Sequence, residues 1–68
     1  MEQRIGDTAG EIWKALKKSG ETSISKVPKI VKQKDTLTYL ALGWLAREGK
    51  LVFRSSGNST LVSLSGKN

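Results

Sequence analysis

Four lysines lie within nine residues of this 68-residue chain, at positions 26, 29, 32 and 34, and no acidic residue interrupts them. The whole chain has 12 basic and 6 acidic residues, which gives a net charge of +6. Such an excess favours nucleic acid, an anionic membrane surface or an acidic protein as partner. The alternative is an ordinary solvated face that keeps a small domain soluble.

The side chains most often used in catalysis and metal binding are missing. The sequence has no histidine and no cysteine, which removes the usual general base, thiolate ligands and disulfides. The six acids occur singly, and three serines, Ser55, Ser56 and Ser59, share a glycine-containing loop in which Arg54 is the only basic neighbour. We therefore expect no enzyme, no metal, no cofactor and no small-molecule ligand.

Nothing in the sequence predicts a membrane protein. The longest apolar run, residues 39–46, is far shorter than the roughly 20 residues of a membrane-spanning helix. The first residues, Met-Glu-Gln-Arg, are not followed by the apolar stretch of a signal peptide. The sequence therefore predicts a cytoplasmic protein.

The first predicted helix covers residues 5–19. Thr8 and Glu11 have the spacing of a capping box, so Thr8 or Asp7 is expected to begin it, and Gly20 to end it. An apolar stripe recurs at intervals of three and four residues and is expected to pack in the core: Ala9, Ile12, Trp13 and Leu16.

A short strand at residues 21–24 and a second helix at residues 26–32 are expected next. Ser25 is the predicted N-cap of this helix, and Pro28 occupies its third position, where a backbone N–H is not needed. The predicted inward residues are Ile24, Val27, Ile30 and Val31, which leaves the lysines in solvent.

The third predicted helix begins after a tight link, with Asp35 as its cap, and ends at Gly49. It has more apolar residues than one face can hold. The spacing predicts that five residues point inward: Leu37, Thr38, Ala41, Leu42 and Leu45. Four others then fall on the outer side: Tyr39, Leu40, Gly43 and Trp44.

The last segments predict a β-hairpin. Residues 51–54 and 60–64 alternate in polarity around a Gly- and Asn-containing turn at 55–59, and pairing Phe53 with Val62 and Leu51 with Leu64 puts all four on one face. The element order is that of an α+β winged helix-turn-helix, to which the short strand adds a third strand. We expect one domain over residues 1–68, with an ordered core at about 5–64 and a frayed tail at 65–68.

Two blocks of the sequence resemble a known family. Residues 5–13, Ile-Gly-Asp-Thr-Ala-Gly-Glu-Ile-Trp, and residues 39–50, Tyr-Leu-Ala-Leu-Gly-Trp-Leu-Ala-Arg-Glu-Gly-Lys, look like small stand-alone prokaryotic winged helix-turn-helix proteins of uncharacterised function. The resemblance implies a winged-helix fold and nucleic-acid-binding relatives. Thr38 departs from it, because an apolar residue such as valine is expected there, so its hydroxyl is expected to bond to a backbone carbonyl one turn back.

In such a fold the residues that enter the major groove come from the start of the third helix. The candidates nearest to base edges are Gln33, Thr36 and Tyr39, and the candidates for phosphate contact are Lys26, Lys29, Lys32, Lys34, Arg47 and Arg54. Together they predict a DNA-binding transcription regulator that contacts mainly phosphates, with salt-sensitive and weakly selective binding.

A second interpretation uses the outer side of the same helix. Tyr39, Leu40, Gly43 and Trp44 place aromatic anchors beside a small residue, as protein interfaces do. They could serve a homodimer or another protein partner. The alternative is that Trp44 folds under the hairpin, against Phe53 or Leu61, and belongs to the core.

Overall fold

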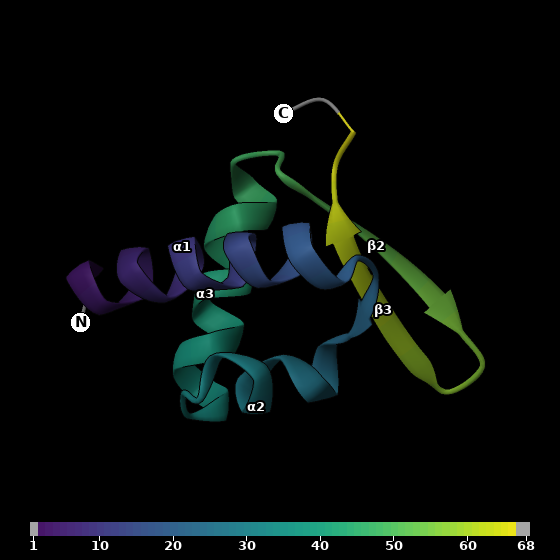
Figure 1. The fold of residues 1–68 in the computed structure, drawn as a ribbon, viewed down its shortest axis with the longest axis horizontal. Coiled ribbons are helices and arrows are strands. Elements are labelled where there is room, and N and C mark those ends of the chain that lie inside the picture. Colours follow the sequence, from purple (N-terminus) through teal and green to yellow (C-terminus); the bar gives the residue numbers. More distant parts are fainter. Residues whose placement is uncertain (1, 67–68) are drawn as a thin grey trace.

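The computed structural model describes residues 2–66. The elements run in the order α1 (Glu2–Ser19), β1 (Thr22–Ser23), the short 3₁₀ helix η1 (Ile24–Lys26), α2 (Val27–Val31), α3 (Asp35–Arg47), β2 (Leu51–Ser56) and β3 (Ser59–Leu64). The strands form one antiparallel sheet in the order β1-β3-β2. In Figure 1 the three helices pack together and the β2–β3 hairpin projects from one side of them. The predicted winged-helix fold is confirmed.

Helix α1 begins three residues earlier than the sequence indicated. Ile5 packs against the core, which extends the apolar stripe of Ala9, Ile12 and Leu16 back by one turn. Thr8 is therefore a buried residue in the middle of the helix, and the prediction that Thr8 or Asp7 caps it was wrong. The end was predicted correctly, since Gly20 has φ +80° and its N–H donates to Leu16 O at 2.8 Å.

Helix α2 is shorter than predicted, because η1 takes up the residues before it. Ser25 lies inside η1 and pairs with the Ser23 hydroxyl at 3.0 Å, so it does not cap α2. Pro28 becomes the second residue of the helix instead of the third. Val27 and Val31 are buried as predicted, but Ile30 is 45% exposed, because a helix of five residues turns only one narrow face to the core.

Helix α3 divides its side chains as the sequence predicted. Leu37, Thr38, Ala41, Leu42 and Leu45 are all buried. Asp35 is the first helical residue and its side chain makes no capping bond, so the predicted cap was wrong, although its charge still lies in the first turn. The helix ends in a Schellman motif, in which the N–H groups of Gly49 and Lys50 donate to Ala46 O and Leu45 O, both at 3.0 Å.

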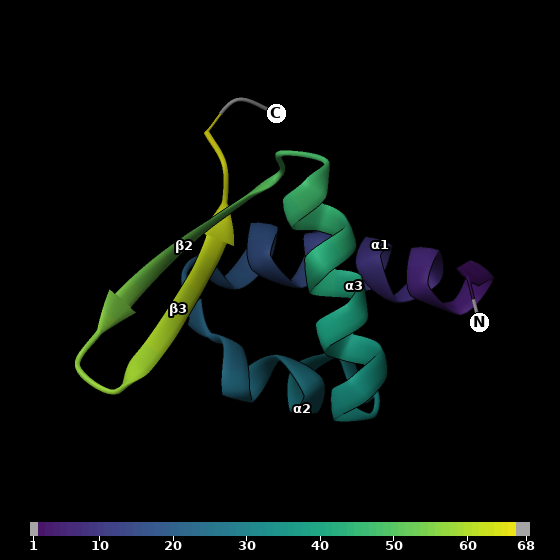
Figure 2. The same cartoon turned by 180° about the vertical axis from the view of Figure 1, so that it is seen from behind.

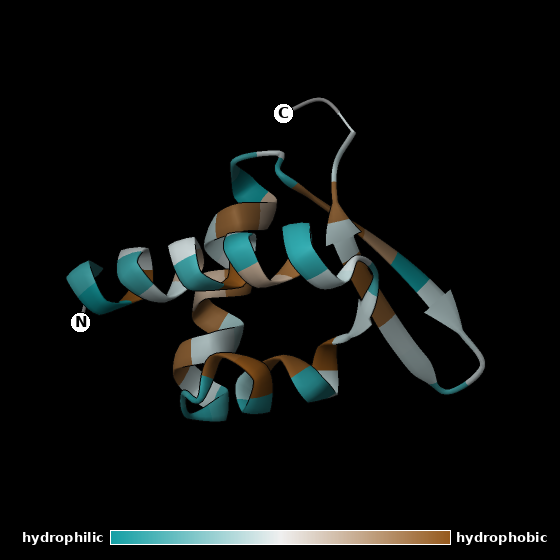
Figure 3. Ribbon diagram, in the orientation of Figure 1, coloured by the Kyte–Doolittle hydropathy of each residue, from teal (hydrophilic) through white to brown (hydrophobic). Residues whose placement is uncertain are grey.

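The core lies where the three helices meet the inner face of the sheet. In Figure 3, α2 turns hydrophobic residues toward α1 and α3 and hydrophilic residues outward. Phe53 pairs with Val62, and Leu51 with Leu64, as predicted. Val62 is fully buried, whereas Phe53, on the edge strand, is 45% exposed. The strands are longer than predicted and leave a two-residue turn, Gly57-Asn58.

Ser65, the first residue of the predicted frayed tail, is hydrogen-bonded to the rest of the domain. The Ser65 N–H donates to Lys50 O at 2.9 Å, which continues the hairpin pairing beyond β3. The rest of the predicted frayed tail includes residues 67 and 68, which lie outside the described residues.

The Thr38 hydroxyl does not make the bond expected of it. The side chain is fully buried, and Oγ1 has no hydrogen-bond partner among the described residues. A buried hydroxyl without a hydrogen-bond partner destabilises the folded state.

Replacing Thr38 with valine should stabilise the protein. The substitution keeps nearly the same shape and removes the unpaired hydroxyl, so the free energy of unfolding should rise by about 1 kcal/mol. Urea denaturation followed by circular dichroism measures this, with Thr60→Val on the hairpin as control. A loss of stability on Thr38→Val would mean that the hydroxyl has a partner after all.

Candidate nucleic-acid interface

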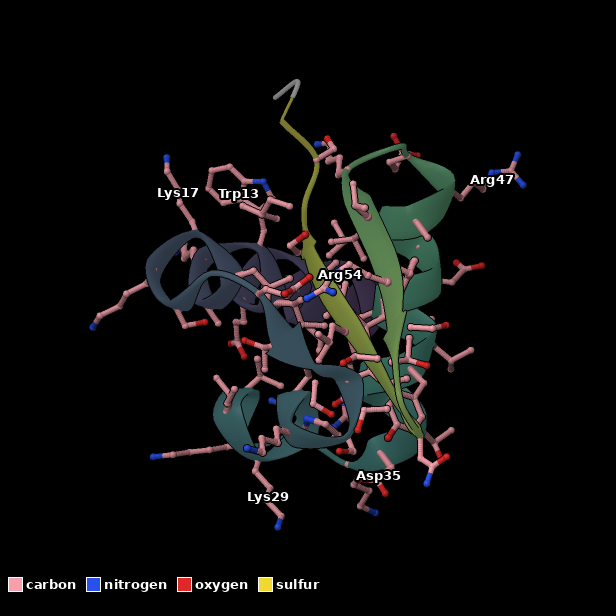
Figure 4. All side chains as sticks on the ribbon, turned by 90° about the vertical axis from the view of Figure 1, so that its right-hand side faces the viewer. Trp13, Lys17, Lys29, Asp35, Arg47 and Arg54 are labelled. Atoms are coloured by element: carbon pink, nitrogen blue, oxygen red, sulfur yellow. The ribbon has the colours of Figure 1, made fainter. Side chains whose placement is uncertain are left out.

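The four clustered lysines lie on a continuous stretch from the end of η1, through α2, to the start of α3. We call residues 26–34 the basic segment; its lysines are Lys26, Lys29, Lys32 and Lys34, and all four are exposed. Within residues 2–66 the only salt bridge joins Arg54 to Glu21, so no carboxylate of these residues neutralises the segment. Figure 4 shows Lys29 pointing away from the body of the domain.

Lys32 has an unusual backbone conformation. It is the C-cap of α2, with φ 60° and ψ 43°, and among the described residues it is the one non-glycine residue with positive φ. The turn closes on Pro28 O, which accepts from the Gln33 N–H at 3.0 Å. Glycine is the residue that favours this conformation, and the turn of a helix-turn-helix often contains it. A lysine here costs about 1 kcal/mol or more relative to glycine.

The three residues predicted to lie nearest to base edges are brought to the same end of the domain as the basic segment. Gln33 is in the turn and half-buried, while Thr36 and Tyr39 follow on the first turns of α3 and are exposed. Arg4 joins this region, since it lines a hollow of about 190 Å³ with Lys34 and Thr36. Sequence reasoning missed Arg4, because α1 was expected to begin after it.

Arg47 lies at the opposite end of α3. It is the last residue of the helix, so twelve steps of 1.5 Å separate it from Asp35, or about 18 Å along the axis. Figure 4 shows Arg47 at the top of the domain and Asp35 and Lys29 at the bottom. Arg47 therefore does not form one cluster with the basic segment.

Arg54 is held by a carboxylate. It lies on the outer face of the sheet, opposite to the face of Phe53 and Val62, and its Nε and Nη2 donate to the Glu21 carboxylate at 2.9 and 2.7 Å. The hydrogen bond from Arg54 lowers the pKa of Glu21, and the same bond raises the pKa of Arg54. The ion pair is therefore intact at neutral pH, and a phosphate would have to compete with Glu21 for this guanidinium.

The outer face of α3 has almost no polar groups for reading bases. No charged residue occurs between Thr36 and Ala46. Leu40 is 45% exposed and Trp44 is 47% exposed, so Trp44 does not pack under the hairpin as a core residue. Figure 2, seen from behind, shows α3 in front of α1 and beside the hairpin. This arrangement places positive charge at one end of α3 and an apolar surface along its middle.

The comparisons with known proteins agree with this architecture. A family model described as "Winged helix-turn-helix domain (DUF2582)" matches residues 1–64. The chain belongs to this winged helix-turn-helix family. It is 34% identical over 64 residues to the uncharacterized protein MJ1608 of Methanocaldococcus jannaschii, an alignment that covers 90% of each protein.

A solved structure is similar to this domain over nearly its whole length. The solution NMR structure of protein BT2368 from Bacteroides thetaiotaomicron has a TM-score of 0.85 and 32% sequence identity, and the match covers 96% of this chain and 79% of that one. The predicted resemblance to an uncharacterised winged-helix family is confirmed. Winged helix-turn-helix domains are typically DNA-binding proteins without enzymatic activity. Within residues 2–66, every helix is too short or too polar to span a membrane.

Releasing Arg54 should show whether the hairpin takes part in binding. Glu21→Gln frees the guanidinium, so affinity for duplex DNA at low salt should rise by about threefold. The slope of log affinity against log salt concentration should become steeper by about 1, which corresponds to one more phosphate contact. Fluorescence anisotropy of a labelled duplex measures both quantities. Arg54→Gln is the matched control and should weaken binding. Unchanged affinity in both variants would place Arg54 outside the interface.

Proposed function

We propose that this domain binds duplex DNA mainly through its phosphates and acts as a transcription regulator with weak sequence selectivity. The observation that carries the proposal is the left-handed conformation of Lys32. A strained residue kept at an exposed turn, where glycine would be more stable, is a candidate for function. An ammonium group that projects from the centre of the basic segment supplies that function by binding phosphate.

The neighbouring residues support the same role. Lys26, Lys29 and Lys34 extend the positive surface on both sides of Lys32. Gln33, Thr36 and Tyr39 would meet base edges or sugars, because the start of α3 is the end that enters the major groove in proteins of this fold. Arg47 and Arg54 would contribute only if the duplex also reached the far end of α3 and the outer face of the hairpin.

The role proposed is binding without catalysis, and we place the protein in the cytoplasm, where it would meet chromosomal DNA. The weak selectivity follows from the contacts available. Contacts to phosphates carry no sequence information, and the uncharged middle of α3 offers no Arg, Lys, Asn or Gln to read a purine.

Lys32→Gly should change stability and binding in opposite directions. Glycine relieves the left-handed backbone and should raise the free energy of unfolding by about 1 kcal/mol, while the loss of the ammonium group should weaken duplex binding several-fold and reduce the salt slope by about 1. Urea denaturation and anisotropy titrations at several salt concentrations measure the two effects.

The matched control is Lys18→Gly, which also removes a lysine charge but lies in the last turn of α1, outside the basic segment. It should destabilise the helix and leave the salt slope nearly unchanged. Equal losses of affinity in the two variants would mean that only net charge matters and that the basic segment is not the interface.

The exposed face of α3 favours a second candidate function. Tyr39, Leu40 and Trp44 are each about half exposed, and an added Cβ at Gly43 would meet no atom within 4 Å. Such a face is suited to a homodimer or to another protein. Sedimentation at rising protein concentration distinguishes these two possibilities, because only a homodimer of this chain would increase the measured mass.

A further inference from the structure

We propose that a groove between α1 and α3 binds an acidic segment of a partner protein, which inserts one apolar side chain between Trp13 and Trp44. The proposal goes beyond DNA binding and does not depend on the basic segment. It shares Trp44 with the second candidate function but uses residues of α1 in place of Tyr39, Leu40 and Gly43.

The groove contains both tryptophans of the chain. Its volume is about 340 Å³; Trp13 of α1 and Trp44 of α3 line it, and the buried side chains of Ala9 and Leu45 form its base. Trp13 was expected in the core, but it is only half-buried. Two partly exposed indoles around an apolar base are suited to receive a hydrophobic anchor.

Two glycines keep the groove open. Gly6 and Gly10 line it and are four residues apart in the interior of α1, where glycine weakens a helix relative to alanine. An added Cβ at either position would meet no atom within 4 Å. The packing of the described chain therefore does not require glycine here, whereas a partner backbone approaching α1 closely would require it.

The positive charge of the groove favours an acidic occupant. Lys14 and Lys50 line the groove, and none of the lining residues is acidic. A third ammonium group, Lys17 Nζ, lies 4.7 Å from the centroid of the Trp13 ring. A second copy of the chain would bring a matching set of like charges to this surface, so an acidic partner is favoured over self-association.

The lining also favours an apolar side chain over a nucleic-acid base or a free small molecule. A base stacked between the indoles would need partners for its polar edge. Apart from the indoles and lysines, the lining consists of two glycines and the apolar side chains of Ala9 and Leu45. The groove is open to solvent, so it would cover little of a small molecule, whereas a chain segment extends past it and reaches both lysines.

The test uses ¹⁵N-labelled full-length protein and a synthetic amphipathic peptide of about 12 residues, rich in Asp and Glu, with Phe and Leu spaced by three and four residues. We expect saturable shifts of both tryptophan indole N–H signals. A peptide with Ser in place of Phe and Leu, and one with Gln in place of the acids, should each bind at least about tenfold more weakly.

Gly10→Leu and Gly43→Leu are matched variants. Both replace an exposed helical glycine where the structure leaves room for a side chain, and leucine favours a helix more than glycine does. Both variants should therefore fold with an equal or higher melting temperature. Gly10→Leu fills the groove and should weaken peptide binding by about tenfold or more. Gly43→Leu lies outside the lining and should leave peptide binding unchanged. Lys14→Glu and Lys50→Glu should each weaken it several-fold, and Lys29→Glu should not.

Four results would overturn the proposal. They are no saturable indole shift with the acidic peptide, equal binding of the Gln peptide, equal loss in Gly10→Leu and Gly43→Leu, and tighter groove binding by an oligo-dT strand or by N-acetylphenylalanine than by the peptide. DNA binding by the basic segment is measured separately through Lys32→Gly, so failure of one proposal leaves the other standing.

Discussion

The structure depends on how α3 divides its side chains. Five residues of this helix are buried, and three of them, Ala41, Leu42 and Leu45, belong to the hydrophobic core that residues of α1, α2 and β3 complete. A helix of 13 residues can turn only one stripe to a core of this size, so its remaining apolar residues must face solvent. The exposure of Leu40 and Trp44 is therefore a consequence of core packing.

The basic segment and the groove occupy different parts of the domain. The four lysines of the basic segment lie on η1, α2 and the turn before α3, whereas both tryptophans line the groove between α1 and α3, together with Lys14 and Lys50. We assign the proposed duplex to the basic segment because four exposed lysines lie close together there and can bind phosphates. We propose different partners for the two regions, so that an acidic protein would be held beside DNA.

The sequence predicted what periodicity determines and missed what depends on local geometry. The five inward residues of α3 and the pairing of Phe53 with Val62 followed from spacing alone. The caps at Thr8, Ser25 and Asp35 were wrong, because a polar residue near a helix start does not reveal on which turn the helix begins. The strained Lys32 turn and the Arg54–Glu21 pair have no sequence signal, since each depends on segments brought together by folding.

The division of α3 can be tested directly with two leucines of the same helix. Leu45 is 5% exposed and Leu40 is 45% exposed. In urea denaturation, Leu45→Ala should lower the free energy of unfolding by about 2–5 kcal/mol, because it leaves a cavity in the core. Leu40→Ala should lower it by about 1 kcal/mol or less. Equal destabilisation by the two variants would contradict the account, because Leu40 would then be serving the core.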